Sequence, residues 1–300
     1  MALPNLIEYA APVPPQRELP PSRAPWVLEP ARAAVLVHDL QRYFLRPYAP
    51  GCSALASALA QTARILAAAR AAGIPVFYTA QNGEKADRGL QGDLWGPGMS
   101  PEPDHTEIVA EVAPAEGDTV LLKHRYSAFA KSELAELLAA QGRDQLVVTG
   151  VYAHIGITAT AFDGFCRDVQ PFVVADAVAD FGADQHARAL DEVAACCGVV
   201  ALADDVVAAF GATASRSAPT EEDGWAGLVR GSLAALLPPE VVAQAFAEPE
   251  ADLFELGLNS LQAFDMLDDL ADAGVDIDFG DFTRRATVGF LLEQGAVLAS

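Results

Sequence analysis

Three short apolar runs in the first half of the chain each end in a residue or turn that could do chemistry: Asp39 after residues 33–38, Lys123 after residues 119–122, and the Tyr152–Gly156 turn after residues 146–148. Such runs, rich in β-branched residues, predict buried parallel strands. Ligands of open α/β sheets bind beyond the carboxyl ends of the strands. We therefore predict that an acid, a base and a glycine-containing turn meet in one active site.

The elements that must position these residues alternate along the chain. Predicted strands cover residues 33–38, 74–79, 119–122, 146–148, 171–175 and 199–202, with helices at 53–72, 132–141, 156–167 and 183–195. Strands that alternate with helices predict an α/β fold with a doubly wound parallel sheet. The stretch from Gln81 to Thr106 lacks periodicity. A loop of that length inside a compact domain is usually functional.

The character of the sequence changes after about residue 212. We expect an α/β domain over residues 1–212, with a proline-rich arm over 1–30, a linker over 213–222 and a second domain over 223–300. The second domain shows helical patterns alone, at 225–237, 260–273 and 288–298 with a short turn near 279–282. It holds fourteen acidic residues against three arginines. We predict a small, acidic, all-α module of four helices.

Composition excludes several classes of function. The net charge of −22 and a pI near 4.4 argue against a nucleic-acid site or an anionic membrane surface as partner. No apolar run reaches the ~18 residues of a spanning helix, and the N-terminus does not read as a signal peptide, so we expect a cytoplasmic protein. Four cysteines without ligand spacing predict no metal site. His38 and His154 lack such spacing too, and we expect them to be satisfied or second-layer histidines.

Six motifs in register resemble the isochorismatase branch of the isochorismatase-like (cysteine hydrolase) superfamily over roughly the first 210 residues. They are Val37–Phe44 (VHDLQRYF), Tyr78–Gln81 (YTAQ), Trp95–Gly98 (WGPG), Lys123–Phe129 (KHRYSAF), Thr149–Gly156 (TGVYAHIG) and Val174–Phe181 (VADAVADF). The resemblance implies a layered α/β fold and an oligomer, for which we expect a dimer.

Position 156 separates the branches of this superfamily. In amidase members an Asp and a Lys activate a cysteine at the turn, and here that position is Gly156. Cys166 lies nearly three helical turns further on and cannot replace it. Cysteine amidohydrolase chemistry is therefore disfavoured. The resemblance implies instead that the enolpyruvyl vinyl ether of isochorismate is hydrolysed to 2,3-dihydro-2,3-dihydroxybenzoate and pyruvate, which is the leading prediction.

The resemblance implies that Asp39 protonates the terminal methylene of an enolpyruvyl group, after which water captures the oxocarbenium ion. Asp39 must then be protonated near pH 7, so its pKa has to rise from ~3.9. Burial and an anionic substrate would raise that pKa, whereas Lys123 would lower it. We expect substrate carboxylates near Lys123 to offset its effect, and Lys123 to orient the substrate and stabilise developing charge.

Further roles follow from the resemblance. Gln81 and Arg88 would hold substrate carboxylates, Tyr152 and the N–H of Gly156 would hold the enolpyruvyl carboxylate, and Phe44 and Trp95 would wall the pocket. An Arg guanidinium suits this purpose because its planar fork binds carboxylates through two hydrogen bonds.

The segment Asp252–Leu261 (DLFELGLNSL) resembles the motif of acyl and aryl carrier domains, in which a serine at the start of a helix receives 4′-phosphopantetheine. Ser260 occupies that position, where helix N–H groups and the helix dipole favour a phosphate. Asn259 stands where many carriers have Asp. The alternative is that Ser260 has no functional role and is an ordinary helix N-cap.

Together the two halves resemble bifunctional isochorismatase/aryl carrier proteins of siderophore pathways. The expected partners are a phosphopantetheinyl transferase, an aryl-adenylating enzyme and a condensation domain of nonribosomal peptide synthesis. The acidic residues Asp265, Asp268, Asp269 and Asp272 would suit a basic partner, and Phe264 and Phe279 would add apolar contacts. Two alternatives stay open: the same reaction on 2-amino-2-deoxyisochorismate, as in phenazine-type enzymes, and a catalytically dead scaffold that acts only as a carrier.

Overall fold

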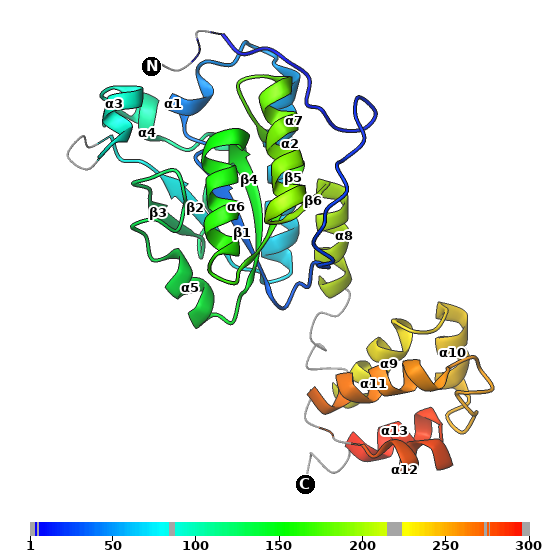
Figure 1. Ribbon diagram of the computed structural model, residues 1–300. Helices are drawn as coiled ribbons and strands as arrows, with labels where there is room; N and C mark the ends of the chain where they lie inside the picture. The colour runs from blue at the N-terminus through cyan, green and yellow to red at the C-terminus, as the bar shows by residue number, and fades with distance from the viewer. Residues whose placement is uncertain are drawn as a thin grey trace. The chain divides into compact units, whose positions relative to one another are not determined.

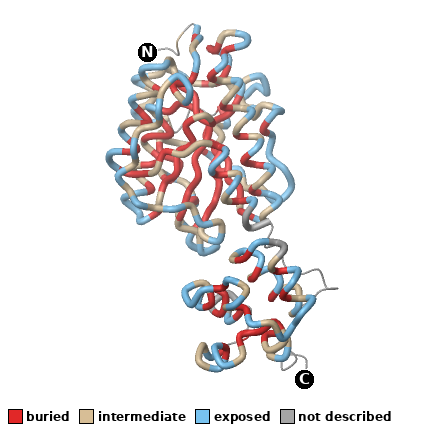
Figure 2. Tube along the Cα trace, turned by 90° about the vertical axis from the view of Figure 1, so that its right-hand side faces the viewer, coloured by how far each residue is buried: buried red, intermediate tan, exposed pale blue. Residues whose placement is uncertain are grey.

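A computed structural model describes residue 4 and residues 6–83, 88–214, 224–272, 275 and 277–295 (Figure 1). The chain divides into two units, residues 1–214 and residues 215–300. Each unit has its own buried interior (Figure 2). We describe each unit by itself.

The first unit is built on a parallel sheet of six strands in the order β3-β2-β1-β4-β5-β6. Its strands are β1 (Ala33–His38), β2 (Val76–Ala80), β3 (Thr119–Leu122), β4 (Gln145–Val151), β5 (Gln170–Ala179) and β6 (Val199–Ala201). All five strand pairs are parallel, which confirms the predicted doubly wound sheet. The chain reverses its direction of winding between β1 and β4. Ligands of such sheets bind at this switch point.

Helices cover both faces of the sheet because alternate residues of each strand point to opposite sides. Val35, Val37 and Val147 belong to the core beneath α2 (Ser53–Ala71) and α8 (Ala203–Ala214). Leu36 and Val148 belong to the core beneath α5 (Leu134–Ala140), α6 (Thr158–Phe165) and α7 (Ala183–Cys196). The shorter elements are α1 (Arg42–Leu45), α3 (Gln91–Trp95), α4 (Pro103–Thr106), η1 (Ala110–Val112) and η2 (Ala153–Ile157).

The main difference from the predicted elements is α8. No helix was predicted over residues 203–214, and the small polar residues suggested a linker from residue 213, but residues 213 and 214 still belong to this helix. Val206 and Phe210 are buried against the sheet, and that burial outweighs the weak local signal. Most of the predicted linker, residues 215–222, lies outside the described residues. In the proline-rich arm, Ile7 is buried and forms a parallel bridge with Tyr48, so this part of the arm packs on the body.

The second unit is all-helical in its described residues. It contains α9 (Gly224–Ala234), α10 (Pro239–Ala247), α11 (Ser260–Asp272), the short α12 (Phe279–Arg284) and α13 (Val288–Gly295). Its core gathers Leu233, Met266, Phe282 and Leu291. Helix α10 was not predicted, although Pro239 at its first turn is a start signal. Among the described helices of the whole chain, none is both long and apolar enough to cross a membrane.

Candidate active site

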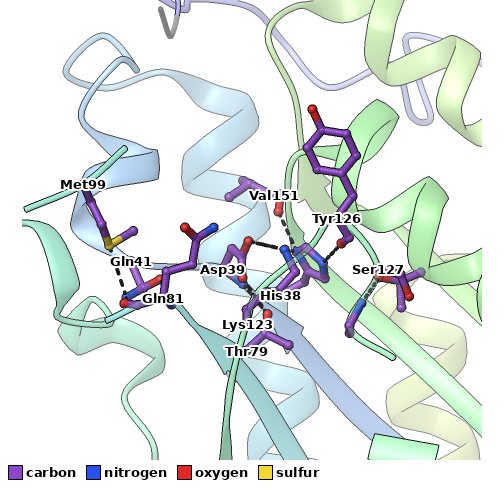
Figure 3. A network of polar contacts seen from close by, with 12 residues as sticks. His38, Asp39, Gln41, Thr79, Gln81, Met99, Lys123, Tyr126, Ser127 and Val151 are labelled. Carbon is purple, nitrogen blue, oxygen red and sulfur yellow. Dashed lines mark hydrogen bonds and ion pairs between the residues drawn. The ribbon is translucent and has the colours of Figure 1, made fainter. Parts of the chain in front are cut away.

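Asp39 follows β1 directly and is buried beside the ends of two neighbouring strands. Its φ of 54° lies in the left-handed region, which Asp tolerates better than most residues. Lys123 Nζ lies 2.7 Å from Asp39 Oδ2, and the Thr79 hydroxyl donates to Oδ1 at 2.6 Å (Figure 3). Thr79 is adjacent because β1 and β2 pair His38 with Thr79. Both carboxylate oxygens of Asp39 are therefore engaged.

Lys123 reaches Asp39 from the end of β3. Its backbone N–H donates to Ala80 O at 2.8 Å, which extends the β2–β3 pairing by one residue and turns the side chain inward. The ammonium is almost fully buried. A buried charge is costly unless it is paired and hydrogen-bonded. The acid and the base of this site thus depend on each other for burial.

The surroundings of Asp39 pull its pKa in opposite directions. Burial raises the pKa, whereas the Lys123 ammonium and hydrogen bonds from Lys123 and Thr79 lower it, and the net result is a pKa below the usual range of Asp. His38 has little effect on the Asp39 pKa at neutral pH, because burial and Lys123 lower the pKa of His38 to about 4 and the ring is then uncharged. Its 3.8 Å approach to Asp39 is accordingly not an ion pair. Lys123 and Thr79 therefore favour the carboxylate form of Asp39.

Gln41 ties both ends of the long loop to the sheet. Its side-chain oxygen accepts the Gln81 N–H at 2.8 Å, and its amide nitrogen donates to Gln81 O at 2.7 Å and to Thr106 O at 2.6 Å. The side chain is fully buried, so these bonds do not compete with water. One amide therefore fixes Gln81 and the two ends of the segment that carries Arg88 and Trp95.

The turn after β4 brings Tyr152 and Gly156 to the same edge of the sheet. Tyr152 is buried, and its hydroxyl donates to Phe44 O at 2.5 Å. A carboxylate placed here would meet the ring of Tyr152 and not a free O–H donor. Asp180, fully buried after β5, accepts the His154 N–H at 2.7 Å and holds the turn in place. The ring Nδ1 of His154 lies 2.5 Å from Asp180 Oδ1, so His154 is a satisfied histidine.

A cavity of about 620 Å³, its open mouth included, lies beyond these strand ends. All eight residues predicted for the first domain's site line it: Asp39, Phe44, Gln81, Arg88, Trp95, Lys123, Tyr152 and Gly156. The structure adds residues that sequence reasoning missed: His38, Tyr43, Gln91, Tyr126, Val151, Ile155 and Phe181. Several of these stand inside the recognised motifs, which was the available signal. Trp95 donates to the Tyr126 hydroxyl at 2.5 Å, which joins the long loop to the segment after β3.

Arg88 lies against Gly98, where a Cβ would come within 1.9 Å of its Nη1. Its Nε atom is buried and has no hydrogen-bond partner among the described residues. Buried donors are normally satisfied. Arg88 also lines the cavity, so a carboxylate there would meet the guanidinium through its terminal nitrogens and not through the buried Nε.

Ser260 is exposed at the first residue of α11 in the second unit. Asn259 caps this helix: its Oδ1 accepts the Gln262 N–H at 3.0 Å, and Gln262 Oε1 accepts the Asn259 N–H at 3.0 Å. This reciprocal pair is a capping box. Asn259 and not Ser260 is therefore the N-cap, and the Ser260 hydroxyl makes no hydrogen bond within the described part of the chain. These features fit a site for covalent modification.

The surroundings of Ser260 are partly apolar. Leu261 is exposed, and Phe264 stacks on Phe279 with ring centroids 3.9 Å apart. The side chains of Asp265, Asp268, Asp269 and Asp272, which we expected to suit a basic partner, lie outside the described residues. Among described residues, no group of three or more His, Cys, Asp or Glu could hold a metal ion.

Comparison with known proteins identifies both units. The isochorismatase domain model matches residues 33–205, and the phosphopantetheine attachment site model matches residues 231–293. The chain belongs to the isochorismatase family. Its second unit is a carrier domain for phosphopantetheine. The predicted family, the enzyme class and the covalent cofactor are thereby confirmed, and such a carrier acts with a phosphopantetheinyl transferase and with enzymes of nonribosomal peptide synthesis.

Individual relatives match in different ways. Isochorismatase from Bacillus subtilis is 34% identical, with 96% of this chain and 93% of that protein covered. Enterobactin synthase component B from Escherichia coli is 43% identical over 70% of this chain and 73% of its own length. Phenazine biosynthesis protein PhzD from Pseudomonas fluorescens is 45% identical over 68% of this chain and 98% of its own length. A cysteine hydrolase structure from Pseudomonas syringae superposes with a TM-score of 0.58 at 26% identity, covering 65% of this chain and 98% of that one.

Proposed function

We propose that the first unit hydrolyses the enolpyruvyl vinyl ether of isochorismate to pyruvate and 2,3-dihydro-2,3-dihydroxybenzoate. One observation carries the proposal: a buried Asp39–Lys123 pair lines a cavity whose turn presents Gly156 in place of a nucleophile. An acid and a base without a nucleophile suit a reaction that needs a proton and a water molecule.

In the proposed reaction Asp39 gives its proton to the terminal methylene carbon, and the enol ether becomes an oxocarbenium ion. Water adds to that cation and loses a proton to the Asp39 carboxylate. The resulting hemiketal then breaks the bond between its central carbon and the ether oxygen attached to the ring. The hemiketal hydroxyl loses its proton and becomes the ketone of pyruvate, and the ether oxygen takes up a proton and leaves as a hydroxyl of the dihydrodiol. Lys123 would orient the substrate and offset the negative charge of the substrate carboxylates. Its ammonium is placed for this role because it lies 2.7 Å from Asp39 Oδ2, beside the acid.

Arg88 and Gln81 would bind substrate carboxylates, and their places in the lining of the cavity support this role. Phe44 and Trp95 would enclose the ring. The N–H of Gly156 would face the enolpyruvyl carboxylate; for Tyr152, whose hydroxyl already donates to Phe44 O, we propose a packing role beside it.

Ser260 is the residue that we propose to carry 4′-phosphopantetheine. The exposed hydroxyl on a helix that is capped by Asn259 supports the assignment. The bound group supplies a thiol on a flexible arm, which forms a thioester with an aryl acid. We further propose a cytoplasmic homodimer that acts with an aryl-adenylating enzyme and a condensation domain in siderophore or related peptide synthesis.

The test is pyruvate release from isochorismate and from 2-amino-2-deoxyisochorismate, measured side by side with purified protein. The amino substrate is the second candidate, since the similarity to PhzD covers nearly all of that protein. We expect a clear preference for isochorismate, because a fused carrier implies an acid that is later activated. Preference for the amine would reassign the substrate, and release from neither would mean that the first unit is a scaffold.

A further inference from the structure

The Gly156 turn packs against the ring of His38. A Cβ built on Gly156 would lie 2.2 Å from His38 Cε1, 2.9 Å from Nε2 and 3.2 Å from Nδ1. Real Cβ atoms do not approach other atoms as closely as the first of these distances. The imidazole therefore occupies the space that the first atom of any side chain at position 156 would need.

The ring of His38 cannot easily move aside. It is fully buried, its Nδ1 lies 2.9 Å from Val151 O, and its Nε2 lies 3.3 Å from Tyr126 O. Val151 leads into the turn, and Tyr126 stands in the segment that follows Lys123. The ring is therefore held between the two segments that form the site on either side of Asp39 (Figure 3).

The backbone of Gly156 does not itself require glycine, because its φ lies outside the left-handed region. Gly150 is different. Its φ is +112°, and a Cβ there would lie 2.1 Å from the backbone oxygen of His38. A side chain at either position would thus clash with His38: at position 156 with the imidazole ring, and at position 150 with the backbone.

We propose that His38 is a specificity-determining residue, whose ring replaces the side chain that a covalent mechanism would need at position 156 and so restricts this site to water-dependent cleavage of vinyl ethers. The proposal rests on the proposed function for the identity of the substrate. The exclusion itself follows from packing: a nucleophile at position 156 and an imidazole at position 38 cannot share one volume. A small residue at position 38 would be the first requirement for amide hydrolysis through a thiol.

The experiment is a double-mutant cycle with a matched control. Gly156→Ala is made in the wild-type and in the His38→Val background, and Gly150→Ala is made in the same two backgrounds. Val removes the ring and, as a β-branched residue, suits the end of a strand. Thermal unfolding of the first unit and kcat/KM for pyruvate release are measured for each variant.

Gly156→Ala alone should lower kcat/KM by about 100-fold, because the turn must shift by about an ångström. It should also lower the thermal midpoint by about 4 °C, as expected for an overpacked core. In the His38→Val background the additional effect of Gly156→Ala should fall to about threefold or less, because the ring that blocks the new methyl group is gone; such a difference between backgrounds is the coupling expected of residues in contact. Gly150→Ala should be equally damaging in both backgrounds, because its obstacle is the backbone.

Two results would overturn the proposal: Gly156→Ala behaving like the wild type, or Gly156→Ala damaging the His38→Val protein as much as it damages the wild type. The thermal midpoints keep the test independent of the substrate. If the wild type releases no pyruvate, the proposed function fails, while the unfolding data still decide whether the ring of His38 excludes a side chain at position 156.

Discussion

In the proposed reaction Asp39 must hold a proton, yet Lys123 and Thr79 favour its carboxylate form. Lys123 and Thr79 both bind its oxygens, and the net pKa is lowered. Asp39 must therefore take up a proton from solvent as the substrate binds. The substrate carboxylates would offset the charge of Lys123 and so raise the Asp39 pKa. At the residue scale, the proposed mechanism depends on this coupling between substrate binding and the protonation of Asp39.

The coupling predicts a specific pH dependence. In the free enzyme the Asp39 pKa lies below the ordinary value, so above that pH the protonated fraction falls about tenfold for each pH unit. We expect kcat/KM to fall with a slope of about −1 in log units between pH 5 and pH 8, while kcat stays flat up to the higher pKa of the complex. Calorimetry of a non-reacting dianionic analogue in buffers of different ionisation enthalpy should show uptake of about one proton. A pH-independent kcat/KM would contradict the coupling.

Lys123→Met tests the same pair through stability. Removing the ammonium leaves a buried carboxylate whose pKa should rise above its unfolded value, because the Thr79 hydrogen bond alone then opposes the effect of burial at neutral pH. A raised pKa gives stability that is lost as the pH rises through it. We expect a loss of about 3–5 kcal/mol near pH 7, smaller at pH 5 than at pH 8, in urea unfolding. Lys123→Met combined with Asp39→Asn is the matched control, and its loss should not depend on pH in this way.

At the scale of elements, the sheet edge is what assembles the site. Each strand end presents one residue, and the parallel register brings Asp39, Thr79 and Lys123 together although they are far apart in sequence. The long loop then closes over them from β2. Gln41 holds both ends of that loop, so it should act on substrate binding without touching the substrate.

Gln41→Glu is the test of this anchoring. The variant keeps the size of the side chain but loses the two N–H donors to Gln81 O and Thr106 O, and it places a carboxylate opposite two carbonyl oxygens. We expect KM to rise by about tenfold or more, since a buried hydrogen bond of this kind contributes about 1–3 kcal/mol, with a smaller change in kcat. Arg42→Gln, whose side chain is half exposed, is the control. A change confined to kcat would argue against a role in binding.

The strand ends could be predicted from sequence because apolar runs mark buried parallel strands and each of them stops at a distinctive residue. Asp39, Lys123 and the turn from Tyr152 to Gly156 were found in this way, and the family resemblance supplied Gln81, Arg88 and Trp95. Thr79 was missed because its role depends on strand register, which one sequence does not give. His38 and Gln41 were missed as site residues because their partners are backbone carbonyl groups, which have no sequence signature.

At the scale of the whole molecule, two units carry separate chemistry on one chain. Their sites use different elements, a sheet edge in the first and a helix start in the second. The α/β and all-helical halves were predicted because the periodicity changes between them, whereas α8 was not, because its end resembles a linker in composition. Because the carrier domain is fused to the enzyme, the domain that makes the precursor of the acid and the domain that later holds the acid belong to one chain.

Ser260→Ala tests the carrier. Incubation with coenzyme A and a phosphopantetheinyl transferase should add one phosphopantetheine group to the wild type and none to Ser260→Ala, as followed by intact-protein mass spectrometry. Ser232→Ala, in α9 of the same unit, is the matched control and should be loaded. Modification of Ser260→Ala would place the attachment site at another residue.

The central claim is that Asp39 supplies the proton, and Asp39→Asn tests it most directly. The amide keeps the shape of the side chain and cannot act as the acid. In a pyruvate-release assay with isochorismate, we predict a kcat at least about 1,000-fold below the wild type, with circular dichroism showing a folded protein. A folded Asp39→Asn variant that releases pyruvate at the wild-type rate would contradict the account.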